Sequence, residues 1–136
     1  MPMDVKETAI EIHKKVWGLF DYTSDKRNYD KMEDWRSHAK AVNAGERFKD
    51  DCDGFALTCC ELLIEAGVPR EDVKMIVCQA ETEGWHAICG VDAEGTTWIL
   101  DNRYKKVYDY NHRPGYKYHH FMRMSHPGKW LKVTND

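Results

Sequence analysis

The sequence has no excess of positive charge. Its formal net charge is −3 at pH 7, and its lysines and arginines are scattered along the chain. Binding to nucleic acid needs a positive field, so no nucleic-acid partner is expected. One segment, from Tyr104 to Lys132, is locally rich in His, Tyr, Lys and Arg. A solvated aromatic surface is favoured for this segment over a binding strip for a polymer or an acidic partner.

Long apolar runs and targeting signals are also absent. No run of about 18 apolar residues occurs, so no membrane span is expected. Residues 1–4 lack the basic segment followed by an apolar one that a secretory signal needs. The chain as given is therefore expected to be cytoplasmic, with export by other means left open.

The cysteines lack the patterns of a disulfide framework or a zinc ribbon. An odd number of cysteines without a secretion signal argues against a framework, and no C-x-x-C pair is present to bind zinc. The five are Cys52, Cys59, Cys60, Cys78 and Cys89. Four of them lie in apolar contexts that are typical of buried residues. Cys52 is the exception.

What is present suffices for one folded domain. A length of 136 residues and a hydrophobic share of 42% favour a single domain over residues 1–136. Apolar residues at helical spacing predict helices over residues 4–20 and 51–66, the second ended by Gly67. The segment between them is polar, with a short helix predicted over residues 32–41.

Strands follow the two longer helices. Alternating apolar residues predict strands over residues 73–79, 85–91, 96–101, 107–110 and 116–122. The second and third of these are separated by a short turn that contains glycine, so we expect them to form a hairpin. Helices followed by a run of strands indicate the α+β class.

The predicted hairpin brings a histidine and an aspartate together. If the turn is centred on Ala93 and Glu94, residues whose numbers sum to 187 face each other, and His86 lies opposite Asp101. Opposed residues project from the same face, with Cβ atoms about 5 Å apart. A carboxylate beside an imidazole fixes its tautomer and stabilises its protonated form, as a general base requires. The alternative is a structural His–Asp pair at the end of a sheet.

Cys52 lies at the predicted start of the second long helix. Free backbone N–H groups and the helix dipole favour a thiolate there, and the same N–H groups can donate to an oxyanion. A cysteine at a helix start, a histidine on a strand and an aspartate after it point to acyl transfer through a thioester. A second oxyanion donor is expected from the polar segment before Cys52, with the candidates Asn28, Tyr29 and Trp35.

The acidic residues beside Cys52 have two interpretations. Asp51 is placed to cap the helix. Asp51 and Asp53 are also placed to face a hard cation such as Ca²⁺, which takes carboxylate oxygens. From spacing alone, capping and solvation are favoured over a metal site.

Four short motifs follow one another along the chain: DCDGFA at 51–56, GVP at 67–69, WHA at 85–87 and LDN at 100–102. Over about residues 35–118 the chain resembles the bacterial transglutaminase-like cysteine peptidases, relatives of the calcium-dependent periplasmic protease that releases a biofilm adhesin. The resemblance implies a catalytic triad of Cys52, His86 and Asp101. It also implies a papain-like or transglutaminase-like α+β core, in which the Cys-bearing helix packs on an antiparallel β-sheet.

In the adhesin-releasing branch, the acids that flank the cysteine contribute to a calcium site, which implicates Asp51 and Asp53. Gly54 stands where many relatives have an acid. Many relatives also carry a longer N-terminal region and an export signal, which this chain lacks as given. A compact form of this kind is compatible with a phage or mobile element as well as a bacterial source.

The predicted function is that of a cysteine hydrolase. It would cleave a peptide, isopeptide or cell-wall amide bond through a thioester, with a protein or a peptidoglycan-type peptide as substrate. No cofactor is expected to be required, and Ca²⁺ is the one candidate that the resemblance adds. The alternatives are a transglutaminase-type acyltransferase, in which an amine replaces water, and a non-catalytic binding module on the same fold. A zinc protein is also considered, but no common zinc spacing fits the cysteines together with His119, His120 and His126.

Overall fold

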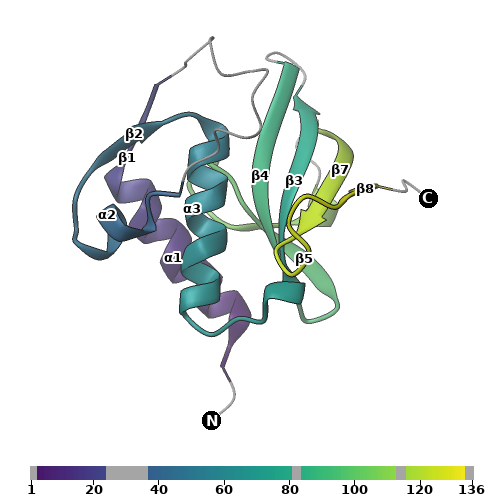
Figure 1. The fold of residues 1–136 in the computed structure, drawn as a ribbon, viewed down its shortest axis with the longest axis horizontal. Helices are drawn as coiled ribbons and strands as arrows, with labels where there is room; N and C mark the ends of the chain where they lie inside the picture. The colour runs from purple at the N-terminus through teal and green to yellow at the C-terminus, as the bar shows by residue number, and fades with distance from the viewer. Residues whose placement is uncertain (1–2, 24–36, 81–83, 113–115, 134–136) are drawn as a thin grey trace.

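Helices and a large sheet lie side by side in the computed structural model, with the helices on the left of the view in Figure 1. The structure describes residues 3–23, 37–80, 84–112 and 116–133. The α-helices are α1 (Val5–Leu19), α2 (Ala39–Asn43) and α3 (Cys52–Glu65), and two 3₁₀ helices are η2 (Arg70–Asp72) and η3 (Tyr110–His112). Within these ranges no helix has the length and apolar character needed to cross a bilayer.

The large sheet is antiparallel throughout and has the strand order β6-β5-β4-β3-β7-β8. Its strands are β3 (Val73–Ala80), β4 (Gly84–Ala93), β5 (Thr96–Leu100), β6 (Tyr108–Asp109), β7 (Lys117–Arg123) and β8 (Trp130–Lys132). Two further strands, β1 (Phe20–Tyr22) and β2 (Phe48–Asp50), form a small parallel pair. Helix α3 packs on β3 and β4. The predicted α+β class, with a Cys-bearing helix on an antiparallel sheet, is confirmed.

Helix α1 begins where the sequence supplies a cap. The side chain of Asp4 accepts a hydrogen bond from the N–H of Glu7 at 3.1 Å, which satisfies one of the free donors of the first turn. The buried side of α1 includes His13, whose ring meets the edge of the Phe55 ring in α3. Helix α1 therefore packs against the helix that begins with Cys52.

Helix α3 is the most deeply buried helix. Phe55, Cys59 and Leu63 are each 0% exposed, and their spacing of four residues places them on one side of the helix. The helix ends at Glu65, and Gly67 follows with a φ of 107°, which favours glycine. The predicted helix over residues 51–66 is therefore correct to within one residue at each end.

The β4–β5 hairpin differs from the prediction in its register. The paired residues sum to 189 rather than 187, because the turn is centred on Glu94 and Gly95. Both have positive φ, 56° and 79°, as in the two-residue turns that match the twist of a hairpin. His86 therefore does not lie directly opposite Asp101. The residue opposite each position is two residues later than predicted, however, and a register shift of two keeps every side chain on its predicted face.

The remaining differences lie outside the central elements. The strands predicted at residues 107–110 and 116–122 correspond to β6 and β7. Strands β1, β2 and β8 carry no alternation long enough to be recognised from the sequence. The predicted helix over residues 32–41 lies largely outside the described residues, and α2 begins only at Ala39.

The C-terminal aromatic segment is not the solvated surface that was favoured from the sequence. Tyr116 and Tyr118 are only 7% and 3% exposed, and they pack with Ile76, Ile88 and other residues in a second apolar cluster. The sheet therefore has apolar side chains on both faces, with the helices covering one and tyrosines covering part of the other.

Candidate active site

Cys52 is the first residue of α3 and is half-buried. Asp51 occupies the N-cap position before it, as predicted, but its side chain makes no capping hydrogen bond. The first backbone N–H groups of the helix lack partners within the helix, which gives the thiol a neighbourhood of free donors. The position of Cys52 thus provides the electrostatic setting of a reactive thiol.

His86 lies on β4 and contacts both other members of the predicted triad. Its Nε2 atom is 2.8 Å from Oδ1 of Asp101, and its ring lies close enough to Cys52 for the thiol to influence its pKa. Because Nε2 is engaged by the carboxylate, Nδ1 is the ring nitrogen left for the thiol. Both members of the His–Asp pair are buried, with exposures of 6% for His86 and 0% for Asp101.

The pair is held in its charged form. Burial disfavours a charged ring, but the hydrogen bonds and negative charges of Asp101 and Cys52 outweigh it and raise the pKa of His86 to about 9. Burial would likewise raise the pKa of Asp101, yet the hydrogen bond and charge of His86 bring that pKa below its usual value. The two shifts agree, because each describes an imidazolium beside a carboxylate.

Asp101 has further partners that the sequence did not reveal. Its Oδ2 atom accepts hydrogen bonds from the hydroxyls of Tyr108 at 3.0 Å and Tyr116 at 2.8 Å. Its backbone carbonyl lies 2.9 Å from Nε2 of the buried His13. His13 is 88 residues from Asp101, and the two tyrosines follow Asp101 by 7 and 15 residues, at spacings that no regular element predicts.

The other four cysteines are buried and 0% exposed, as their apolar contexts predicted. Burial is the main reason why the pKa values of Cys59, Cys78 and Cys89 are raised. Raised pKa values and the lack of exposure make these thiols poor nucleophiles. Cys52 alone among the cysteines is partly open to solvent.

Three aspartates meet at the start of α3. One carboxylate oxygen from each of Asp50, Asp51 and Asp53 lies within 4.8 Å of the others. Oδ1 of Asp51 is buried and has no hydrogen-bond partner among the described residues. Burial and then the charge of Asp50 raise the pKa of Asp53. Crowded carboxylates with an unsatisfied oxygen fit a hard cation.

Asp50 was not among the predicted ligands. Its carboxylate lies 2.7 Å from Nε2 of His38 and accepts the backbone N–H of Asp51 at 2.7 Å. It also lies directly over Gly54, where an added Cβ would come within 2.0 Å of Oδ2. The Asp50 carboxylate therefore occupies the space that an acid at residue 54 would need.

Two other sets of residues are candidates from the sequence, the oxyanion donors and the late histidines. The candidate oxyanion donors Asn28, Tyr29 and Trp35 lie outside the described residues. Across the parts of the chain that the structure describes, the three aspartates are the sole cluster with metal-binding geometry, and it includes none of the late histidines.

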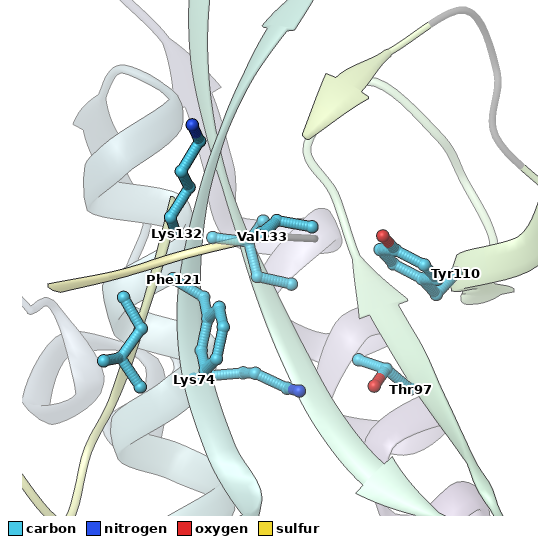
Figure 2. Close-up of a pocket in the computed structure, with 8 residues that line it drawn as sticks. Lys74, Thr97, Tyr110, Phe121, Lys132 and Val133 are labelled. Atoms are coloured by element: carbon cyan, nitrogen blue, oxygen red, sulfur yellow. The ribbon is translucent and has the colours of Figure 1, made fainter. Parts of the chain in front are cut away.

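A separate cavity of about 490 Å³ opens on the sheet, and Figure 2 shows its lining. Lys74, Thr97 and Phe121 from the sheet line it together with Tyr110 and Val133. Neither Cys52, His86 nor Asp101 contributes to it. This cavity is therefore not the space in which the candidate triad would act.

An α+β core whose helix begins with cysteine and packs on an antiparallel sheet is the architecture of papain-like cysteine peptidases. The sequence model of the bacterial transglutaminase-like cysteine proteinases matches residues 3–136, and the chain belongs to this family. It is therefore a cysteine peptidase, and the resemblance inferred from the four motifs is confirmed. No curated protein sequence matches the chain.

Solved structures of Legionella pneumophila LapG are similar to this fold. One is 19% identical, with a TM-score of 0.73, and the match covers 97% of this chain and 71% of LapG. The EGTA-treated form is also 19% identical at a TM-score of 0.73, covering 96% of this chain and 68% of that one. The calcium-bound form is 18% identical at a TM-score of 0.68, with coverages of 96% and 75%.

Proposed function

We propose that the protein cleaves peptide bonds in a protein substrate through a thioester on Cys52. His86 would act as general base and acid, and Asp101 would orient His86. The observation that carries the proposal is the position of the His86 ring, which is hydrogen-bonded to a buried carboxylate at 2.8 Å and lies close enough to the thiol at a helix start for the two to interact. This is the relation of nucleophile, base and orienting group that covalent catalysis needs.

The steps follow from these positions. The Cys52 sulfur attacks the carbonyl carbon, a C–S bond forms, and the oxyanion is stabilised by N–H groups at the start of α3. The C–N bond then breaks, and the leaving amine takes its proton from His86. Neutral His86 next removes a proton from water, which attacks the thioester carbonyl. The C–S bond breaks, the carboxylic acid leaves, and the Cys52 thiolate and protonated His86 are restored.

The test is to identify the acyl group on the enzyme. The protein would be mixed with a pool of extracted cell proteins, quenched in acid and mapped by mass spectrometry. We expect acyl adducts on Cys52, with Cys52→Ala inactive and Cys59→Ala, a buried cysteine of the same helix, still active. Adducts on another cysteine, or turnover by Cys52→Ala, would contradict the proposal. Products that carry an added amine would indicate acyl transfer instead of hydrolysis.

We also propose that Asp50, Asp51 and Asp53 bind Ca²⁺. The support is the convergence of their oxygens and the buried, unpartnered Oδ1 of Asp51. One of the solved LapG structures of similar fold is a calcium-bound form. When bound, the cation would neutralise the acids around Cys52 and hold the start of α3, and Asp50 would contribute in place of the acid that Gly54 cannot supply.

Calcium binding is tested on the protein itself. Saturating Ca²⁺ should raise the melting temperature. At a free Ca²⁺ concentration of a hundred times Kd, the free energy of unfolding should rise by about 2.7 kcal/mol. Asp53→Asn should remove the shift, whereas Glu61→Gln, an exposed acid on the same helix, should retain it. A calorimetric titration without heat, together with an unchanged melting temperature, would exclude the site.

A further inference from the structure

Two tyrosine hydroxyls converge on one oxygen of Asp101. Oδ2 accepts hydrogen bonds from Tyr108 at 3.0 Å and from Tyr116 at 2.8 Å. Oδ1 is bonded to His86 at 2.8 Å and accepts the backbone N–H of Arg103 at 3.0 Å. An ionised carboxylate offers about four lone-pair positions, so this one has as many donors as it can accept.

Two donors at each carboxylate oxygen fix the orientation of the Asp101 carboxylate. Asp101 is 0% exposed, and a buried charge is costly unless hydrogen bonds replace its water. Tyr108 in β6 and Tyr116 just before β7 approach from different segments. The carboxylate cannot turn about its Cβ–Cγ bond without breaking both hydroxyl contacts, so Oδ1 stays directed at His86.

Both hydroxyls remain donors over the working range of pH. Burial, and then the negative charge of Asp101, raise the pKa of Tyr108 and of Tyr116 well above the usual value. Neither tyrosine can ionise beside the carboxylate, so each keeps the proton that it donates. Tyr116 also contacts the His86 ring directly, with ring centroids 5.3 Å apart.

We propose that Tyr108 and Tyr116 are positioning residues of the active site, whose hydroxyl groups together hold the Asp101 carboxylate in line with His86. This inference rests on the proposed triad. It gives a role to the aromatic C-terminal segment, which places Tyr116 beside the catalytic pair. The tyrosines would act through Asp101 and would not touch the substrate.

The first test separates turnover from substrate binding. Tyr108→Phe and Tyr116→Phe each remove one hydroxyl and keep the ring. We expect kcat to fall about ten-fold in each, because a hydrogen bond to a charged group is lost, while KM stays within about two-fold. Tyr104→Phe is the matched control, since the Tyr104 ring packs against both other rings. Its backbone N–H donates to the Asp101 carbonyl at 3.4 Å, which the substitution leaves in place, and the described donors to the Asp101 carboxylate do not include its hydroxyl.

The second test is independent of turnover and uses Cys52→Ala protein. The loss in melting temperature caused by Tyr116→Phe should be greatest near neutral pH and should shrink as the pH falls and Asp101 is protonated, because the hydroxyl favours the ionised carboxylate. The loss caused by Tyr104→Phe should not depend on pH in this way. If Tyr116→Phe does not fold in combination with Cys52→Ala, the same comparison with Tyr104→Phe is made in protein that retains Cys52.

The outcomes are distinct. If Asp101→Asn is inactive but Tyr108→Phe and Tyr116→Phe match Tyr104→Phe in kcat, the positioning role is wrong and the triad stands. If Asp101→Asn keeps full activity, the proposed triad itself fails. Equal, pH-independent losses in melting temperature for Tyr104→Phe and Tyr116→Phe would also overturn the inference, because they would show a packing role alone.

Discussion

The thiol of Cys52 differs from the other thiols of the chain in exposure and surroundings. Helix α3 contains three cysteines, yet two lie on its buried side and only Cys52 lies at its first turn. One amino-acid type thus occupies a setting suited to a nucleophile or serves as a small apolar residue, depending on its place in one helix. Residue type and local context in the sequence already separate these cases, because acids surround only Cys52.

This difference predicts selective alkylation. Brief treatment with iodoacetamide near neutral pH should label Cys52 first, because it alone among the cysteines is partly exposed and it lies beside an imidazole. Peptide mapping of the labelled protein gives the answer. In His86→Ala the rate of labelling should fall, because the thiolate loses its cationic partner. Earlier labelling of Cys78 or Cys89 would show that the nucleophile is misassigned.

The hairpin of β4 and β5 shows how far local pattern determines an element. Its strands and its turn could be predicted from alternation and one glycine, but the centre of the turn was placed one residue too early. The positive φ of Glu94 is uncommon for a residue with a side chain, so this turn position could not be predicted from residue type. His86 and Asp101 still meet, because a register difference of two residues leaves both side chains on the predicted face of the sheet.

The start of α3 depends on a contact that no local pattern indicates. Asp50 precedes the helix, yet its carboxylate fills the space above Gly54 inside the helix. Gly54 is therefore required for close approach and not for backbone freedom. In α1, Gly18 has nothing within 4 Å of an added Cβ. The two helical glycines therefore differ in role.

This contrast predicts opposite effects of one substitution. Gly18→Ala should stabilise the protein by about 0.5–1 kcal/mol, since alanine is the better helix former. Gly54→Ala should destabilise it by about 1–3 kcal/mol, because the new methyl group displaces Asp50 from α3. Thermal or urea unfolding measures both free energies. A gain in stability from Gly54→Ala would mean that Asp50 does not occupy this position in solution.

At the scale of the whole molecule, the candidate site joins parts of the chain that are far apart in sequence. Cys52 comes from a helix, His86 from a central strand, and Tyr108 and Tyr116 from the C-terminal segment. Motif order was enough to predict the first two together with Asp101. The tyrosines could not be predicted, because their role depends on how β6 and the chain before β7 return to the end of β5.

The charges of the site also set the pH dependence of the whole molecule. The pKa of His86 is about 9 in the folded protein and its ordinary value is 6.5. Between pH 6.5 and pH 9 the folded protein therefore holds a proton on His86 that the unfolded chain does not. The stabilisation from this group is complete below about pH 6.5 and is lost as the pH rises through about 9. Asp101 acts in the opposite sense, because its pKa is lowered in the folded protein. The stabilisation from this group is present above about pH 3.8 and is lost as the pH falls through the lowered pKa.

Activity should therefore fall on the alkaline side near pH 9, where His86 loses the proton that the leaving amine needs. The measurement is kcat/KM against pH, since this ratio reports the groups of the free enzyme. In Asp101→Asn the remaining activity should show this decline at lower pH, because the imidazolium has lost its carboxylate. Asp109→Asn removes a carboxylate of β6 that has no described contact with His86, and its profile should match the parent. If the alkaline decline in kcat/KM occurs at the same pH in Asp101→Asn as in the parent, the decline belongs to a different group. His86 would then not be the proton donor.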